Sequence, residues 1–380
     1  MSLLFRIRRR LGRLRPAASL PPRPLAEAID FNDPAIARDP YPHWETLRAD
    51  GPVHFLPRTG GWMVLGYDAI KEAFARPDLF SNAPYREVDA VLLGEDPPRQ
   101  AATRRLVSRH FTPDALRRLE DTAARAARVA ASCRFDAVSG FAQPVSRAVA
   151  AELIGFDAAT LAEVSAATDA ASTEPLPVLI AALDAFAPRA VIYRQLLRDG
   201  EGLIGEAEAR SLVRLLWLAS NTTTERVVAR CVLSLAADPD LQRAVRADRT
   251  LVAPFIEEVM RLHPPEHVLP RFTVAEAALG GKTIPAGAPV FLCIGAANRD
   301  PAQFEAPAEL RLERGSKRHF AFGGGIHHCV GAPLARRVVA AAIGALLDAL
   351  PDLRAAEPLD TLPMFASLTA LAPTRLEVEG

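Results

Sequence analysis

The chain has 380 residues, of which 45 are basic and 45 acidic, so its formal net charge is zero. Hydrophobic residues make up 49% of it, enough for a sizeable buried core, which excludes a disordered or fibrous protein. The balanced charge gives no support for a nucleic-acid partner. Four cysteines without a CxxC pair are too sparse for a disulfide framework and favour a reduced compartment, for which we take the cytoplasm.

The first 25 residues differ from the rest. Arginines from Arg6 to Arg15 alternate with apolar residues, and a proline-rich stretch follows. The segment lacks the apolar run of a signal peptide or a membrane anchor. A basic amphipathic helix on an anionic membrane is one interpretation, but a frayed extension is favoured over it. We therefore expect an extension over residues 1–25 and a single domain over 26–380.

Hydrophobic periodicity and turn residues predict the elements of this domain. In chain order they are a short helix at 44–47, a β-hairpin of 53–55 and 62–65, a helix at 69–74, helices from about 106 to 263, strands within 272–292, an irregular stretch, and a helix from near Pro333. Helix is the majority state. The order predicts a mainly α fold with minor β in one compact domain.

The most informative segment is FGGGIHHCVG, from Phe322 to Gly331. Three consecutive glycines let a backbone approach a flat ligand closely and adopt positive φ angles. Cys329 precedes a predicted helix, where amide N–H groups and the helix N-terminus can stabilise a thiolate. A lone axial thiolate suits haem iron, because its electron donation promotes cleavage of the O–O bond.

Other interpretations of this segment compete on the residues alone. A phosphate-binding loop would need a lysine and a Ser or Thr at a spacing that is missing here. A buried free cysteine is usually a small hydrophobic residue. A zinc site would need more ligands than His327 and His328 beside Cys329. Residue chemistry therefore leaves haem ligation and a structural cysteine both open.

The segment resembles the haem-binding loop of the cytochrome P450 family, whose spaced Phe, Gly, Cys and Gly correspond to Phe322, Gly325, Cys329 and Gly331. The resemblance extends over nearly the whole chain. It implies the cytochrome P450 fold, with haem b buried between a distal and a proximal helix and Cys329 bound to the iron. It also implies a monooxygenase that inserts one atom of O2 into an organic substrate, which we expect to be apolar.

A second motif falls in the family's order. Glu258 and Arg261 are three residues apart on a predicted helix and can form a charge-assisted pair, although such pairs are usually solvated surface salt bridges. Their position resembles the family's ExxR motif, which implies Arg314 as a third member and a structural role.

Haem propionates need cationic or hydrogen-bonding partners when they are buried. The resemblance implies Arg104, Arg271 and His327 for this role. Gln100 stands where the family commonly has histidine; it can donate a hydrogen bond but cannot be cationic.

The distal helix departs most from the family pattern. Residues 219–224, ASNTTT, resemble the Ala-Gly-x-acid-Thr-Thr segment of that helix, so Thr223 corresponds to the oxygen-activating threonine, and Thr222 replaces the acid. A hydroxyl and ordered water can relay protons, but a threonine cannot supply one by ionising. Two alternatives remain: the hydroxyls bond back to carbonyls one turn earlier, or a one-residue slip makes Thr222 the key residue.

The substrate and the partners are implied by position. The stretch between Gly155 and Ala219 is shorter than is typical of the family's lid, which indicates an open mouth or a carrier-bound substrate. Six residues are expected to line a pocket above the haem, although they are equally expected as core: Leu218, Ala219, Val268, Leu269, Ser367 and Leu368.

No flavin or iron–sulfur motif stands in the sequence, so a separate ferredoxin and its NAD(P)H-dependent reductase are implied as electron donors. Basic residues on the cysteine side suit an acidic ferredoxin, with a mixed-charge surface as an equal alternative: Arg105, Arg109, Lys317, Arg318, Arg336 and Arg337. We expect a monomer. The competing functions are a haem-binding module without oxygenase activity, and a peroxide-using or oxidative-coupling variant.

Overall fold

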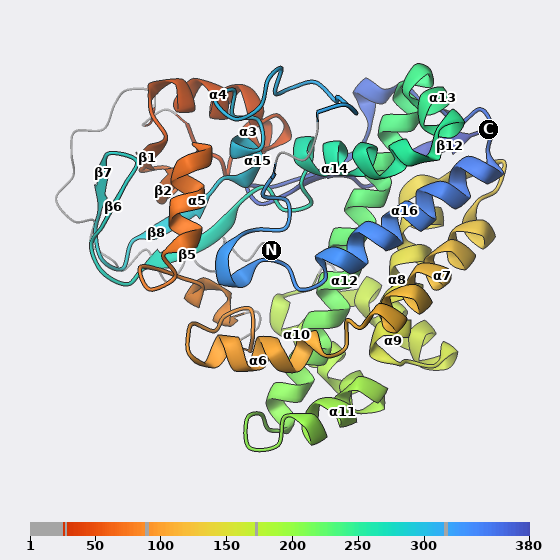
Figure 1. The fold of residues 1–380 in the computed structure, drawn as a ribbon, viewed down its shortest axis with the longest axis horizontal. Helices are drawn as coiled ribbons and strands as arrows, with labels where there is room; N and C mark the ends of the chain where they lie inside the picture. The colour runs from red at the N-terminus through yellow and green to blue at the C-terminus, as the bar shows by residue number, and fades with distance from the viewer. Residues whose placement is uncertain (1–25, 27–28, 88–90, 172–173, 315–317) are drawn as a thin grey trace.

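The computed structural model describes residue 26 and residues 29–87, 91–171, 174–314 and 318–380 (Figure 1). The predicted extension over residues 1–25, and Lys317, lie outside the described residues.

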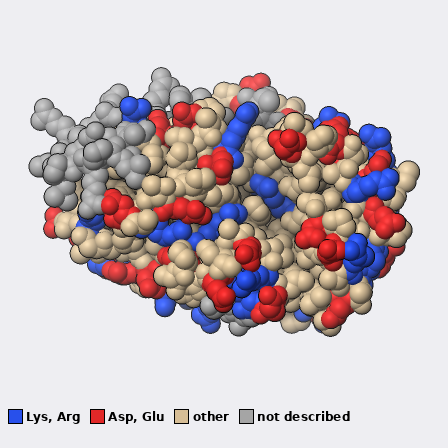
Figure 2. Space-filling model, turned by 90° about the horizontal axis from the view of Figure 1, so that it is seen from above, with Lys and Arg blue, Asp and Glu red and all other residues tan. Residues whose placement is uncertain are grey.

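On the face shown in Figure 2, basic and acidic side chains are interspersed rather than separated into regions of one sign.

A five-stranded sheet occupies the left of Figure 1. Its order is β1 (Val53–Leu56), β2 (Gly61–Val64), β8 (Pro289–Leu292), β5 (Leu269–Thr273) and β3 (Phe80–Ser81). The predicted hairpin is present as β1 and β2, and β2 pairs in parallel with β8. A Cβ at Gly61 would lie 2.5 Å from the Phe291 ring. Glycine therefore lets these two distant segments pair.

In the residues that the structure describes, seven further strands form three small sheets. They are β4 (Arg134–Asp136), β12 (Glu377–Glu379) and β9 (Arg354–Ala355) in one sheet, β10 (Met364–Ala366) and β11 (Leu371–Pro373) in the second, and β6 (Ala277–Leu279) and β7 (Lys282–Ile284) in the third.

Helices make up most of the rest, so the predicted mainly α fold with minor β is confirmed. The α-helices are α3 (Pro34–Arg38), α4 (Tyr41–Asp50), α5 (Tyr67–Ala75), α6 (Arg99–Ser108), α7 (Pro113–Ala130), α8 (Gln143–Ile154), α9 (Ala158–Ala171), α10 (Leu176–Phe186), α11 (Val191–Asp199), α12 (Glu206–Ala237), α13 (Pro239–Ala247), α14 (Val252–Leu262), α15 (Ile294–Ala297) and α16 (Ala332–Ala349). The 3₁₀-helices are η1 (Ala83–Glu87), η3 (Ala187–Arg189), η4 (Arg249–Leu251), η5 (Gly325–His327) and η6 (Leu359–Thr361), and η2 (Ala137–Ala142) is a π-helix.

The 32-residue helix α12 runs through the middle of the helical part (Figure 1). It packs against α8 and α16, and its second half joins a core cluster with α7, α14 and α16. Asp238 ends α12, and its carboxylate accepts hydrogen bonds from the amides of Asp240 and Leu241 at 3.0 Å, which caps α13. This cap gives the Asp-Pro pair a physical reason to mark the end of the helix.

Within the described part of the chain, no single helix is long and apolar enough to cross a membrane. One pair of segments, 176–189 and 191–199, passes the test of length and composition together but is bent by 81°.

Candidate functional site

Cys329 lies at the end of the glycine-rich loop, just before α16. Its amide donates to the Phe322 carbonyl at 2.9 Å, which folds the loop back on itself. The residue is exposed by surface area, yet burial raises the pKa of its thiol, against opposing hydrogen bonds from the amides of Gly331 and Ala332 and the nearby charge of Arg104. The sulfur is therefore accessible to a ligand and at the same time surrounded by protein atoms.

The glycines of this loop make a close approach, but to a helix rather than along a flat ligand. Gly325 has a φ of +61°, and a Cβ there would lie 2.1 Å from the Phe74 carbonyl oxygen at the end of α5. A Cβ at Gly324 would lie 2.6 Å from the Phe74 ring. The loop is therefore held against α5, and only glycine at position 325 permits both the contact and the backbone angle.

Three of the residues implied for propionate binding meet at one point of the loop. Gln100 and Arg104, on α6, donate to the carbonyl of Ile326 at 2.9 and 3.3 Å. Burial, together with the charges of Arg271 and Arg104, lowers the pKa of His327 to about 4. The Nε2 atom of His327 is buried without a partner among the described residues.

Arg271, the fourth, comes from β5 and is only 5% exposed. Its guanidinium donates to the Pro270 carbonyl at 2.8 Å and bonds the Tyr85 side chain. In the described part of the chain no carboxylate forms an ion pair with it. Buried cations and donors that lack an anion are costly unless a ligand supplies one. Arg271, Arg104, Gln100 and His327 therefore fit a ligand that carries carboxylates, as haem does.

One face of α12 is partly exposed although the helix crosses the protein interior. Its residues recur every three or four positions, the spacing of one helical face, and include Ala219, Thr222, Thr223 and Arg226. The Thr223 hydroxyl donates to the Ala219 carbonyl at 2.6 Å, so the back-bonding alternative is present. A hydroxyl that donates once can still accept from water. Thr222 lies on the same face.

The residues expected above the haem divide into two groups. Leu218, Ala219, Leu269 and Ser367 are at least partly exposed, and Leu269 lies close to the loop, 3.6 Å from the position of a Cβ on Gly323. By contrast, Val268 and Leu368 are 1% and 6% exposed and belong to a core cluster that includes Trp44. For these two residues the structure matches the core alternative, because they share a cluster with Trp44 and Leu47 of α4.

Glu258 organises a buried polar network. Its carboxylate accepts from Arg261 at 2.7 and 2.9 Å, from the Arg314 side chain at 2.9 Å and from the Arg311 amide at 3.1 Å. Arg261 is 1% exposed and also donates to the carbonyls of Asn298, Pro307 and Glu309. Burial opposes ionisation of Glu258, but these hydrogen bonds outweigh it and lower its pKa. A solvated surface pair is thereby excluded.

The cysteine side carries mixed charge. A cavity of about 940 Å³ lies between α5, α14 and the glycine-rich loop, and both acidic and basic side chains line it. Arg336 pairs with Glu257 at 2.8 Å, and Arg337 with Glu120 at 3.1 Å. Arg105, Arg109 and Arg318 are exposed. Two of the five described basic residues are thus paired with acids.

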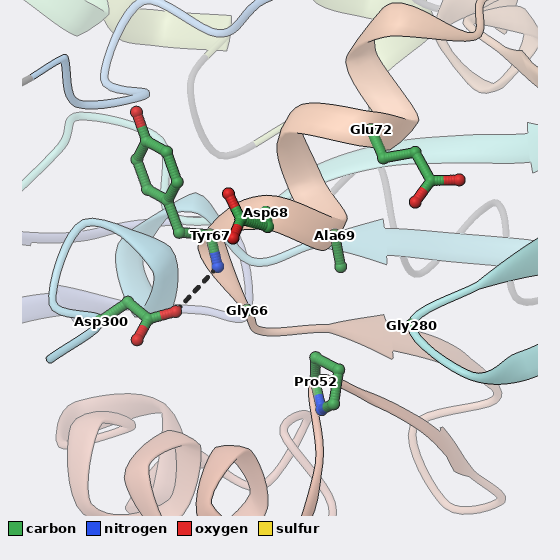
Figure 3. A pocket seen from close by; sticks show the side chains of 8 residues that line it. All are labelled: Pro52, Gly66, Tyr67, Asp68, Ala69, Glu72, Gly280 and Asp300. Atoms are coloured by element: carbon green, nitrogen blue, oxygen red, sulfur yellow. Dashed lines mark hydrogen bonds between the residues drawn. The ribbon is translucent and has the colours of Figure 1, made fainter. Parts of the chain in front are cut away.

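A smaller concavity of about 350 Å³ lies at the start of α5 (Figure 3). Asp300 accepts the Tyr67 amide at 2.9 Å, drawn as the dashed line, and also the Ala302 amide at 3.0 Å. Glu72, further along α5, pairs with Arg76 at 2.6 Å. These carboxylates serve the local fold, since Asp300 caps a helix whose own N-cap position is a glycine.

Sequence reasoning missed a charged group beside the exposed face of α12. Arg226 forms an ion pair with Glu266 at 2.5 Å, and Tyr85 lies within electrostatic reach of both Glu266 and Arg271. The sequence did offer one signal, because Glu266 is the only Asp or Glu between Arg261 and Arg271. The sequence pattern does not say, however, in which direction its side chain points.

Comparison with known proteins places this arrangement in a family. The family model described as Cytochrome P450 matches residues 188–351. The chain is 33% identical to the cytochrome P450 monooxygenase PikC of Streptomyces venezuelae, with 84% of this chain and 85% of that protein covered. It is 31% identical to the cyclomarin C epoxidase CymV of Salinispora arenicola, with 80% and 86% covered.

Solved structures agree with these relatives. The structure of CYP109B1 from Bacillus subtilis superposes with a TM-score of 0.81 at 26% identity, over 90% of this chain and 100% of that one. That of CYP109E1 from Bacillus megaterium, in complex with testosterone, gives 0.82 at 26% identity, over 91% and 98%. The chain therefore belongs to the cytochrome P450 family and is a monooxygenase.

Proposed function

We propose that this cytochrome P450 binds haem b through the Cys329 thiolate and inserts one oxygen atom from O2 into an organic substrate held beside the exposed face of α12. The observation that carries the proposal is the group formed by Arg271, Arg104, Gln100 and His327 around the loop that ends in Cys329. Arg271 in particular is 5% exposed and has no carboxylate partner among the described residues. A buried guanidinium without a carboxylate partner destabilises the protein, and pairing with the propionate carboxylates of haem would remove that cost.

The residues have distinct roles in this site. Cys329 would hold the iron from the α16 side, while Arg271, Arg104, Gln100 and His327 would hold the propionates. When bound, haem supplies the redox chemistry that activates dioxygen, and the thiolate donates electron density that favours O–O cleavage. Because burial raises the pKa of the Cys329 thiol, its ligation of a metal would release a proton.

Thr223 holds the proton-relay position in this proposal. Its hydroxyl donates to the Ala219 carbonyl at 2.6 Å, which orients the oxygen so that its lone pairs can accept from a water molecule. Thr222 has no ionisable group that could supply a new proton to that water molecule. The proton would therefore come from solvent that enters the cavity.

Electrons would come from a separate ferredoxin and its NAD(P)H-dependent reductase. Exposed arginines near the cysteine loop support this choice, because positive charge there would steer an acidic partner. Arg105 and Arg109 follow Arg104 at the end of α6, and Arg318 precedes the loop.

The ligation is tested by the absorption spectrum of the reduced, carbon monoxide-bound protein. We expect a strongly red-shifted Soret band that disappears in Cys329→Ala and persists in Cys133→Ala, which removes an exposed cysteine outside the loop. A band typical of histidine-ligated haem, or an unchanged band in Cys329→Ala, would sink the proposal.

The electron source is tested separately, once a substrate is found by screening. Product formation should require ferredoxin, reductase and NAD(P)H together, and should track the NAD(P)H consumed. Turnover with hydrogen peroxide alone, at a rate no lower than with the redox partners, would instead favour a peroxide-using enzyme.

A further inference from the structure

The ion pair between Arg226 and Glu266 lies next to the proposed site. Arg226 is on α12, one turn after Thr222 and on the same exposed face. Glu266 lies in the segment that joins α14 to β5. Their side chains approach to 2.5 Å, with exposed fractions of 17% for Arg226 and 37% for Glu266.

One intermediate residue, Tyr85, links this pair to Arg271, which is proposed to bind a propionate. Glu266 is close enough to Tyr85 to affect its ionisation, and the Tyr85 hydroxyl bonds Arg271. The guanidinium of Arg226 lies over the Phe365 ring, 5.5 Å from its centroid. The pair therefore lies between α12 and strand β10, and its carboxylate acts electrostatically on Tyr85, the residue that Arg271 bonds.

The two members of the pair are held differently. Arg226 is fixed on three sides, since it donates to the Pro265 carbonyl at 3.0 Å, pairs with Glu266 and lies over Phe365. In the described part of the chain, Glu266 has one hydrogen bond, from Arg226 to Oε1. Burial raises its pKa despite this partner. The carboxylate is thus the more exposed member, and it is incompletely compensated.

A carboxylate can accept about four hydrogen bonds, and charge-assisted bonds are the strongest available to it. A cationic ligand group would complete its coordination, whereas an anionic group would meet the repulsion of Glu266 before it reached Arg226. We propose that Glu266 is a subsite for a positively charged group of the substrate, such as a protonated amine, and that Arg226 positions it. This inference rests on the proposed monooxygenase function and narrows its substrate class from apolar to amphipathic and basic.

Binding of three matched probes to the haem-loaded protein tests the proposal by titration calorimetry. Dodecyltrimethylammonium, dodecanol and dodecanoate share a chain and differ in charge. A quaternary ammonium can neither ligate iron nor donate a hydrogen bond, so it tests the attraction between its charge and Glu266 alone. We expect the wild type to bind the cation at least about tenfold more tightly than the anion, which corresponds to about 1.4 kcal/mol. In Glu266→Gln the ratio should fall to about one.

Glu225→Gln is the matched control. It removes a carboxylate from the adjacent position of α12, whose pKa is also raised by burial but whose hydrogen bond goes to Gln143, on α8. The control should keep the wild-type ratio. A wild-type ratio at or below one would overturn the proposal whether or not any variant folds.

A ratio that survives in Glu266→Gln would also overturn it. If that variant instead bound the probes normally but consumed NAD(P)H without making product, Glu266 would be a proton donor and not a recognition group. The carbon monoxide spectrum reports haem ligation independently of the calorimetric ratio, so failure of the monooxygenase proposal and failure of this one are distinguishable.

Discussion

Removal of the negative charge of Glu258 should destabilise the protein far more than removal of the negative charge of its neighbour, Glu257. In Glu258→Gln the side chain keeps its volume but replaces one acceptor oxygen with an NH2 group, which must then face the N–H donors of Arg261, Arg314 or Arg311. Arg261 is 1% exposed, so water cannot replace the lost carboxylate. Breaking a buried pair in this way costs about 3 to 5 kcal/mol in the free energy of unfolding.

The neighbouring residue is the internal control. Glu257 lies on the same helix and pairs with Arg336 at 2.8 Å and with His319 at 3.1 Å, but its side chain is 37% exposed. An exposed pair of this kind is worth about 0.2 to 1 kcal/mol. Glu257→Gln should therefore cost several times less than Glu258→Gln, although each substitution removes one negative charge from α14.

Denaturant unfolding of both variants and the wild type measures these costs directly. Because the Glu258 network holds residues 298–314, which lead into the glycine-rich loop, Glu258→Gln should also retain less haem. Equal costs for the two variants, or a cost of less than about 1 kcal/mol for Glu258→Gln, would refute the argument that burial sets the strength of this network.

The Glu257 pair also predicts a dependence on pH. Burial opposes ionisation, but hydrogen bonds from His319 and Arg336 lower the pKa of Glu257 from 4.5 to about 2. A lowered pKa means that the stabilisation is fully present above the unfolded-state value and is lost as the pH falls through about 2. The stability gap between wild type and Glu257→Gln should accordingly narrow as the pH falls from about 4.5 towards about 2; a gap that stayed the same or widened over that range would contradict this.

Three further substitutions test other parts of the structure. Asp300→Ala removes the acceptor of the Tyr67 amide and should cost about 1 to 2 kcal/mol in unfolding free energy, whereas Asp300→Asn should cost less. Gly325→Ala should abolish haem retention, because its Cβ would lie 2.1 Å from a carbonyl oxygen at a φ of +61°; Gly202→Ala, at +75° in open space, should cost only about 1 to 2 kcal/mol. Thr223→Ala should lower the ratio of product to NAD(P)H consumed by about tenfold or more, and an unchanged ratio would remove Thr223 from the relay.

Sequence reasoning succeeded where the interacting residues are close along the chain. The cysteine loop is one continuous segment, and Glu258 and Arg261 are separated by less than one helical turn, so both could be recognised by spacing. The same holds for the hairpin of β1 and β2. In each case the local pattern restricts the geometry to one arrangement.

It failed where a contact is made by distant backbone. The amide of Arg311 completes the Glu258 network, and the carbonyl of Phe74 is what the Gly325 Cβ would strike, but amides and carbonyls look the same at every position of a sequence. Val268 and Leu368 lie in a core cluster, and sequence alone could not decide between this position and a pocket. Both are apolar, and an apolar side chain suits a substrate pocket and a core equally well.

The distal helix shows why the charged pair escaped notice. α12 has to satisfy two environments, because most of its circumference packs in the core while one face is partly exposed. Its hydroxyls at positions 222 and 223 can bond their own backbone, so they are tolerated in either environment. Arg226 is different: a guanidinium in the interior needs a partner, and the partner, Glu266, comes from a segment 40 residues away. Position 222 of this helix carries no acid, and the acid that pairs with Arg226 comes from the segment between α14 and β5. In the proposed subsite this carboxylate meets the charged group of the substrate, and the Glu266→Gln variant decides between that role and proton donation.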